Sequence, residues 1–115
     1  DFCQQAVAQS KSQNVDLIIE TAGGIMTPIC TGKTFLDLAG DLDIEIYLVG
    51  ACFLGGISAI LSAYENLKHK NCKKITILVN NHLDFDQKYL KMVDFLAELK
   101  IFVDCEVFLV ENFVK

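Results

Sequence analysis

Four apolar segments rich in β-branched residues alternate with helical patterns along this chain, and that alternation constrains the fold more than any other feature. We predict strands at residues 15–19, 44–49, 74–79 and 101–110. A strand, a helix and a second strand in succession form a crossover unit, which gives a parallel sheet. The runs are nearly continuously apolar, as in strands buried on both sides. The sequence therefore predicts one α/β domain over residues 1–115, with helices on both faces of the sheet.

Helical patterns occupy residues 1–12, 34–40, 55–70 and 84–99. The segment 84–99 is the most amphipathic, and we expect one stripe of it to pack on the sheet, formed by Tyr89, Met92, Val93 and Leu96. The last strand segment, 101–110, contains two acidic residues, so we expect an edge strand or a broken one.

Residues 46–64 contain no charged side chain, and nineteen residues are just enough to cross a bilayer. Three glycines interrupt the run, and its two halves follow different periods. A buried strand, a glycine turn and a helix explain it without lipid. We therefore expect no membrane span.

Charge and cysteine usage exclude several classes of protein. The net charge is −5, and the basic residues form no patch interleaved with aromatics, which argues against nucleic-acid binding. The five cysteines are odd in number and form no CxxC motif, so neither a zinc site nor a disulfide framework is indicated. We expect small core thiols, kept reduced in the cytoplasm. Because the chain begins with Asp, in a helix already under way, we expect a portion of a longer protein.

Ligands of an open parallel sheet bind outside the carboxyl ends of its strands. Three stretches follow predicted strands: residues 20–28, 50–58 and 80–82. In the first, Glu20 precedes Thr21, Ala22, Gly23 and Gly24. Such a carboxylate can ligate a hard cation while the small residues let phosphate approach the backbone. A capping acid before a flexible turn explains the same pattern equally well.

The sequence Thr31-Gly32-Lys33-Thr34 imitates the end of a phosphate-binding loop. The motif requires glycine where Thr27 stands, and the segment lies too far beyond its strand. We instead expect Thr31 or Thr34 to be the N-cap of a short helix at 35–39. No other segment supplies the motif, so the chain alone should not hold triphosphate in the usual way.

Two further stretches admit two interpretations each. The helix that follows Gly55 and Gly56 can offer its first amides to an anion, or the glycines can simply allow close packing. Asn80, Asn81 and His82 can recognise an adenine edge or form a turn.

With these residues the chain resembles the dethiobiotin synthetase family of the P-loop superfamily. The resemblance spans residues 15–83 and rests on VDLIIETAGG at 15–24 with Thr27-Pro28, on Leu48-Val49-Gly50 followed by LGGIS at 54–58, and on AYENLK at 63–68. The second and third stretches are most similar to the branch in which the synthetase is fused to diaminopelargonic acid aminotransferase.

The resemblance implies a reaction and a set of roles. The family carboxylates 7,8-diaminononanoate with CO2, and ATP with Mg²⁺ drives closure of the ureido ring of dethiobiotin. Glu20 would be the catalytic Mg²⁺ ligand, and the phosphates would be lined by Thr21, Ala22 and Gly23. The substrate carboxylate would meet Gly55, Gly56 and Ile57 at a dimer interface, and adenine would meet Asn81 and His82.

The resemblance also implies what this chain lacks. The phosphate-binding loop and its lysine belong to the family's N-terminal half, so we expect an isolated chain without activity. Its partners would be a second copy and the missing half, or a fused aminotransferase domain. A non-catalytic binding or regulatory domain, related to ParA/MinD-like or cobyrinic acid synthase-like proteins, is the alternative. A flavodoxin- or receiver-like domain would require an acidic cluster, and Glu20 stands alone.

Overall fold

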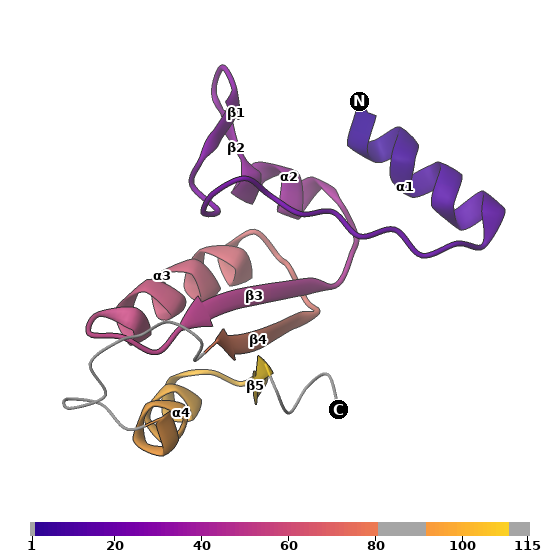
Figure 1. Cartoon of the computed structure of the whole chain (residues 1–115). Coiled ribbons are helices and arrows are strands. Elements are labelled where there is room, and N and C mark those ends of the chain that lie inside the picture. The colour runs from indigo at the N-terminus through magenta and orange to yellow at the C-terminus, as the bar shows by residue number, and fades with distance from the viewer. Residues whose placement is uncertain (1, 81–91, 111–115) are drawn as a thin grey trace.

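The computed structural model describes residues 2–80 and 92–110, and its elements alternate as Figure 1 shows. In chain order they are α1 (Phe2–Gln13), β1 (Pro28–Cys30), β2 (Lys33–Thr34), α2 (Phe35–Asp41), β3 (Ile46–Ala51), α3 (Gly56–His69), β4 (Ile75–Asn80), α4 (Met92–Phe102) and β5 (Glu106–Leu109). Strands β1 and β2 form an antiparallel hairpin, whereas β3, β4 and β5 form a parallel sheet in that order.

The parallel α/β architecture predicted from the sequence is confirmed. Ile46 of β3 lies opposite Ile75 of β4, and Ile77 of β4 lies opposite Val107 of β5. The predicted strands at 44–49 and 74–79 correspond to β3 and β4. The segment 101–110 was predicted as one strand, and this is wrong at its start, because α4 continues to Phe102. As expected, β5 is a short strand at the edge of the sheet.

One continuous core lies between the sheet and its helices. Side chains from α3 and α4 pack on the same face of β4, and α2 and β5 join them; the buried residues are Leu36, Ile60, Tyr64, Leu67, Ile75, Ile77, Val79, Phe95, Leu99 and Val107. The face of the sheet that carries Tyr47 and Val49 is different, because these side chains are 49% and 61% exposed. Helices α3 and α4 thus lie on the face of Ile75, Ile77 and Val79, whereas on the other face the described side chains of β3 are exposed.

The uncharged segment 46–64 divides as predicted into β3, a glycine turn and α3. Gly55 adopts φ 89°, which only glycine does without strain, and it reverses the chain before the helix. At the other end, Asn71 adopts φ 62°, while Cys72 N–H donates to Leu67 O at 3.1 Å. This six-residue bond closes the last turn of α3. In residues 2–80 and 92–110, no helix is long and apolar enough to cross a bilayer.

The segment 15–19 corrects a prediction. It was expected to be a buried strand, but its five residues are exposed and form no strand. Ile18 is 91% exposed. A strand exists only beside a hydrogen-bonding neighbour, and no described strand lies beside this segment. This strand-like segment therefore has no pairing partner among residues 2–80 and 92–110.

Helix α4 corrects a second prediction. The segment 84–91 lies outside the described residues, and with it Tyr89. Val93 was expected to face the sheet, yet it is 77% exposed, whereas Phe95 and Leu99 are completely buried. Leu96 is only partly buried. The buried stripe thus lies on the neighbouring side of the helix, where residues i and i+4 share one face.

Candidate functional site

The loop that begins at Glu20 is exposed but pinned to α2. Leu36 N–H donates to Ile25 O at 2.7 Å, and Phe35 N–H donates to Thr27 O at 3.1 Å. Gly23 adopts φ 110°, and a Cβ there would lie 2.7 Å from Thr27 Oγ1. The turn therefore requires glycine. Glu20 itself has no hydrogen-bond or ion-pair partner among the described residues, so its carboxylate is free to take a ligand.

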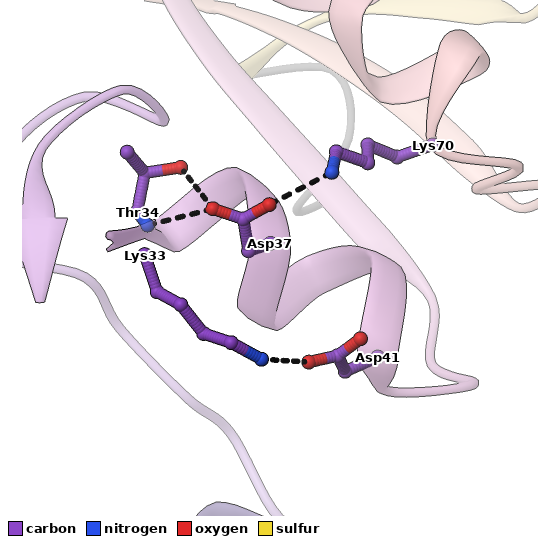
Figure 2. Close-up of polar contacts among 5 residues, drawn as sticks. All are labelled: Lys33, Thr34, Asp37, Asp41 and Lys70. Carbon is purple, nitrogen blue, oxygen red and sulfur yellow. Dashed lines mark hydrogen bonds and ion pairs between the residues drawn. The ribbon is translucent and has the colours of Figure 1, made fainter. Parts of the chain in front are cut away.

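The N-terminus of α2 explains the apparent phosphate-loop motif. As Figure 2 shows, Asp37 accepts hydrogen bonds from Thr34 N–H at 2.8 Å and Thr34 Oγ1 at 3.1 Å, and pairs with Lys70 at 2.7 Å. The Lys70 ammonium, followed by the Thr34 amide, lowers the pKa of Asp37 to about 2. Thr34 is therefore the N-cap, as predicted. Lys33 forms an ion pair of 3.3 Å with Asp41, the last residue of α2, so its ammonium group is used within the structure.

The glycine turn before α3 packs closely against the end of β3. Gly56 is buried, and a Cβ there would lie 2.4 Å from the carbonyl oxygen of Ala51. Its N–H donates to Phe53 O at 2.8 Å, so that amide is already used. The first amides of a helix have no intrahelical acceptor, so the amides of Ile57 and Ser58 need an acceptor from outside α3. The close approach to Ala51 agrees with the packing interpretation of Gly56.

Two of the three stretches expected at the carboxyl ends of the strands lie side by side. Cys52 N–H donates to Asn80 O at 3.4 Å, so the turn before α3 lies beside the carboxyl end of β4. Asn81 and His82 lie outside the described residues. No hydrogen bond or ion pair within residues 2–80 and 92–110 joins Glu20, Thr21, Ala22 or Gly23 to the turn at 55–57. Within the same ranges, no three His, Cys, Asp or Glu side chains group as a metal site.

A polar cluster at the opposite edge of the sheet escaped the sequence analysis. Tyr64 is 1% exposed, and its hydroxyl donates to the Asp104 carboxylate and accepts from Asp104 N–H at 3.2 Å. Lys68 Nζ lies 3.7 Å from Asp104 Oδ1 and 5.3 Å from the centre of the Tyr64 ring. These residues line a cavity of about 350 Å³. Tyr64 and Asp104 are forty positions apart in the sequence, so no local pattern could have indicated their contact.

The buried Tyr64 hydroxyl makes stability depend on alkaline pH. Burial, reinforced by the Asp104 carboxylate, raises the pKa of Tyr64 to about 12. An unfolded tyrosine titrates near 10, so between these values the folded state holds the proton more tightly and stability falls as pH rises. We expect a loss of roughly 2 kcal/mol between pH 10 and 12. Urea unfolding at stepped pH measures it. Tyr64→Phe should flatten this alkaline decline, and an unchanged decline would contradict the assignment.

The cysteines only partly match their prediction. Cys52, Cys72 and Cys105 pack against the core, and burial raises the pKa of each thiol. Cys30, in contrast, is exposed on the β1–β2 hairpin, so the expectation of a core position is wrong there. None of the five cysteines forms a disulfide within the described residues.

Comparison with known proteins agrees with the fold and with the sequence motifs. A family model described as "AAA domain" matches residues 3–107. The chain is 37% identical over 67 residues to the ATP-dependent dethiobiotin synthetase of Phenylobacterium zucineum, covering 58% of this chain and 29% of that protein. It is 31% identical over 110 residues to the synthetase of Campylobacter jejuni, covering 88% and 54%.

A fused enzyme is similar as well. The bifunctional dethiobiotin synthetase/7,8-diamino-pelargonic acid aminotransferase, mitochondrial, of Arabidopsis thaliana is 36% identical over 74 residues, 63% of this chain and 9% of that protein. The chain spans only 29% to 39% of the length of the first synthetases that it matches. The expected resemblance to dethiobiotin synthetases, fused forms included, is confirmed. The chain belongs to the AAA domain family, within the P-loop group of nucleotide-binding proteins.

Proposed function

We propose that this chain contributes part of the active site of an ATP-dependent dethiobiotin synthetase. The observation that carries the proposal is the Glu20 loop: an exposed carboxylate without a protein partner, followed by a glycine turn that hydrogen bonds pin to α2. The named relatives are ATP-dependent dethiobiotin synthetases. The family resemblance implies the reaction, in which 7,8-diaminononanoate takes up CO2 and closes a ureido ring at the expense of ATP.

In this proposal the residues of the chain position charge. The Glu20 carboxylate, a hard oxygen donor, suits Mg²⁺, which neutralises phosphate charge during the transfer. Thr21, Ala22 and Gly23 carry no bulky side chain, so phosphate can approach the backbone. The Ile57 and Ser58 amides suit the substrate carboxylate, beside Gly55 and Gly56, and Asn81 with His82 would meet adenine.

The bond changes are those of a mixed-anhydride ring closure. One amine of the substrate adds to CO2 and loses a proton to form a carbamate. The carbamate oxygen then takes the γ-phosphoryl group from ATP, which leaves as ADP. The second amine then attacks the carbamoyl carbon, and the C–O bond breaks with loss of inorganic phosphate. Positioning and charge neutralisation account for most of the catalysis in such transfers.

The remaining parts of the active site would come from polypeptide outside this sequence. The triphosphate needs a glycine-rich loop with its lysine, and the segment 31–34 is a hairpin turn and helix cap instead. We therefore propose that the isolated chain does not turn over ATP, and that a homodimer of the complete domain forms the substrate-carboxylate site.

A chimera tests the role of Glu20. The 110 residues of the Campylobacter synthetase that align with this chain are replaced by it, and phosphate release is measured with diaminononanoate, bicarbonate and Mg·ATP. We expect Glu20→Gln to lower kcat at least about a hundredfold, as loss of a transition-state charge contact does, and to raise the Mg²⁺ concentration for half-maximal rate. The matched control is Glu65→Gln, an exposed acid on α3, which should change neither quantity.

The same measurement separates the alternative. If Glu20→Gln leaves ATP turnover intact in an active chimera, the carboxylate holds no catalytic metal. The chain would then fit a non-catalytic binding domain that has kept the scaffold. Micromolar Mg·ATP binding to the isolated chain, measured by titration calorimetry, would separately contradict its dependence on an external phosphate loop.

A further inference from the structure

The loop that begins at Glu20 follows the position of α2. Phe35 N–H donates to Thr27 O at 3.1 Å. Leu36 N–H donates to Ile25 O at 2.7 Å, so two backbone hydrogen bonds join the loop to the first turn of the helix. Because hydrogen bonds weaken steeply when their geometry changes, a movement of this turn is transmitted to the loop. The position of the Glu20 carboxylate therefore depends on what holds α2.

Helix α2 has few buried side chains. Of its seven residues only Leu36 is buried, and Leu42, which follows the helix, is buried as well. An isolated helix of this length is unstable in water, so a short helix depends on its tertiary contacts. Each further contact of α2 therefore contributes a large share to fixing its orientation.

An ion pair connects α2 to the C-terminal end of α3. Lys70 Nζ lies 2.7 Å from Asp37 Oδ1, and Figure 2 shows the lysine side chain reaching the helix from outside it. Lys70 is the C-cap of α3, and its own N–H donates to Asn66 O and Leu67 O at 3.1 Å. A Cβ on Gly40 would lie 3.3 Å from Lys70 Cβ, so the backbone of α2 also approaches this residue closely. The ion pair thus joins a fixed point on α3 to the first turn of α2.

The Asp37 carboxylate is held in place independently of Lys70. Its second oxygen, Oδ2, accepts the two hydrogen bonds from Thr34, so the capping box fixes its rotamer. Exposed ion pairs usually contribute little, because two side chains must be ordered and water screens the charges. Here only Lys70 has to be ordered, and the side chains of Asp37 and Lys70 are 27% and 44% exposed. The Asp37 carboxylate, with Asp41 near it, raises the pKa of Lys70. The pair therefore constrains α2 more than a typical surface salt bridge would.

We propose that Asp37 and Lys70 are positioning residues of the synthetase site, because their ion pair fixes the Glu20 loop, through α2, relative to α3. This inference rests on the proposed function, in which Glu20 holds Mg²⁺ and the first turn of α3 meets the substrate carboxylate. Those two groups must keep one geometry during phosphoryl transfer, and a displacement of about 1 Å can lower a rate about a hundredfold. The pair acts on the rate in this way without touching the metal or the substrate.

Hydrogen exchange followed by NMR tests whether the pair holds the loop in the complete 115-residue chain. Lys70→Met should make the two amides that donate to the loop, those of Phe35 and Leu36, exchange at least about fivefold faster, because their bonds open when α2 moves. The matched control is Lys33→Met, which breaks the 3.3 Å ion pair with Asp41 and leaves the link to α3 intact, so these rates should not change. Unchanged exchange in Lys70→Met would overturn the proposal. Equal acceleration of the β4 amides would indicate a loss of global stability and would overturn it as well.

Kinetics of the chimera with the Campylobacter synthetase test the effect on the reaction. Lys70→Met should lower kcat at least about tenfold and raise the Mg²⁺ concentration for half-maximal rate. The KM for diaminononanoate should change less than about twofold, because α3 itself carries the proposed carboxylate site. A smaller amount of folded protein would lower the apparent kcat without moving the Mg²⁺ dependence. Lys70→Arg keeps the cation and should restore both quantities, and Lys33→Met should change neither.

Glu20→Gln in the same chimera separates this inference from the proposed function. If Glu20→Gln lowers kcat while Lys70→Met does not, the proposed reaction stands and the positioning role is wrong. If neither variant lowers kcat although Lys70→Met accelerates exchange, the pair holds the loop but the loop holds no catalytic metal, and both proposals fail. Loss of kcat in both variants, with faster exchange in Lys70→Met alone, supports both.

Discussion

Gly56→Ala should lower the free energy of unfolding by about 3 kcal/mol, at the upper end of what overpacking by one methyl group costs. The added Cβ would lie 2.4 Å from the carbonyl oxygen of Ala51 and 3.3 Å from Phe95 Cε2. A flexible side chain could rotate away from such a contact, but the carbonyl belongs to β3. Either the strand end or the first turn of α3 must therefore move, and the hydrogen bond from Gly56 N–H to Phe53 O would be strained with it.

Two other glycines, Gly24 and Gly55, serve as controls for Gly56. At Gly24 an added Cβ meets nothing within 4 Å and φ is not positive, so Gly24→Ala should be neutral within about 0.5 kcal/mol. At Gly55 the space is equally open but φ is 89°, so Gly55→Ala should cost about 1–2 kcal/mol through the backbone alone. Urea unfolding followed by circular dichroism gives all three values. If Gly56→Ala lowers the free energy of unfolding no more than Gly24→Ala does, then α3 does not pack this closely against the end of β3.

The sequence predicted those elements whose neighbours lie within the chain. The strands at 44–49 and 74–79 pair with each other, and the residues that end and begin α3 are local signals. Because a missing glycine excluded a phosphate loop, Thr31 or Thr34 was expected as the N-cap, and the bonds to Asp37 select Thr34. In each case, the residues that decide the structure are close in sequence or lie on adjacent strands.

The wrong predictions share a different physical origin. The apolar segment 15–19 has the composition of a strand, but pairing depends on a neighbour, which composition cannot supply. The predicted buried face of α4 included Val93, because the apolar residues of this helix allow more than one buried face. The packing of Phe95 against Gly56 selects the actual one. Tyr64 and Asp104 lie forty residues apart, beyond the reach of any periodic pattern.

Phe95→Ala is the second substitution with a large expected effect, and it tests the face of α4 that the structure selects. Phe95 is completely buried and belongs to the core shared with α3 and β4, so removing its ring should cost about 3–5 kcal/mol. Small domains have only about 5–15 kcal/mol in total, so the variant should be close to unfolding at 25 °C.

The matched control lies on the same helix. Phe102 is 55% exposed, so Phe102→Ala should cost less than about 1 kcal/mol in the same urea titration. Had the sheet-facing stripe been the one predicted from Val93, the substitution at Phe95 would be mild and Val93→Ala would be costly. Comparable losses for Phe95→Ala and Phe102→Ala would therefore place α4 in a different rotation. A large difference would require the Phe95 ring to lie between α3 and the sheet, where it holds the turn at Gly56 against the carboxyl end of β3.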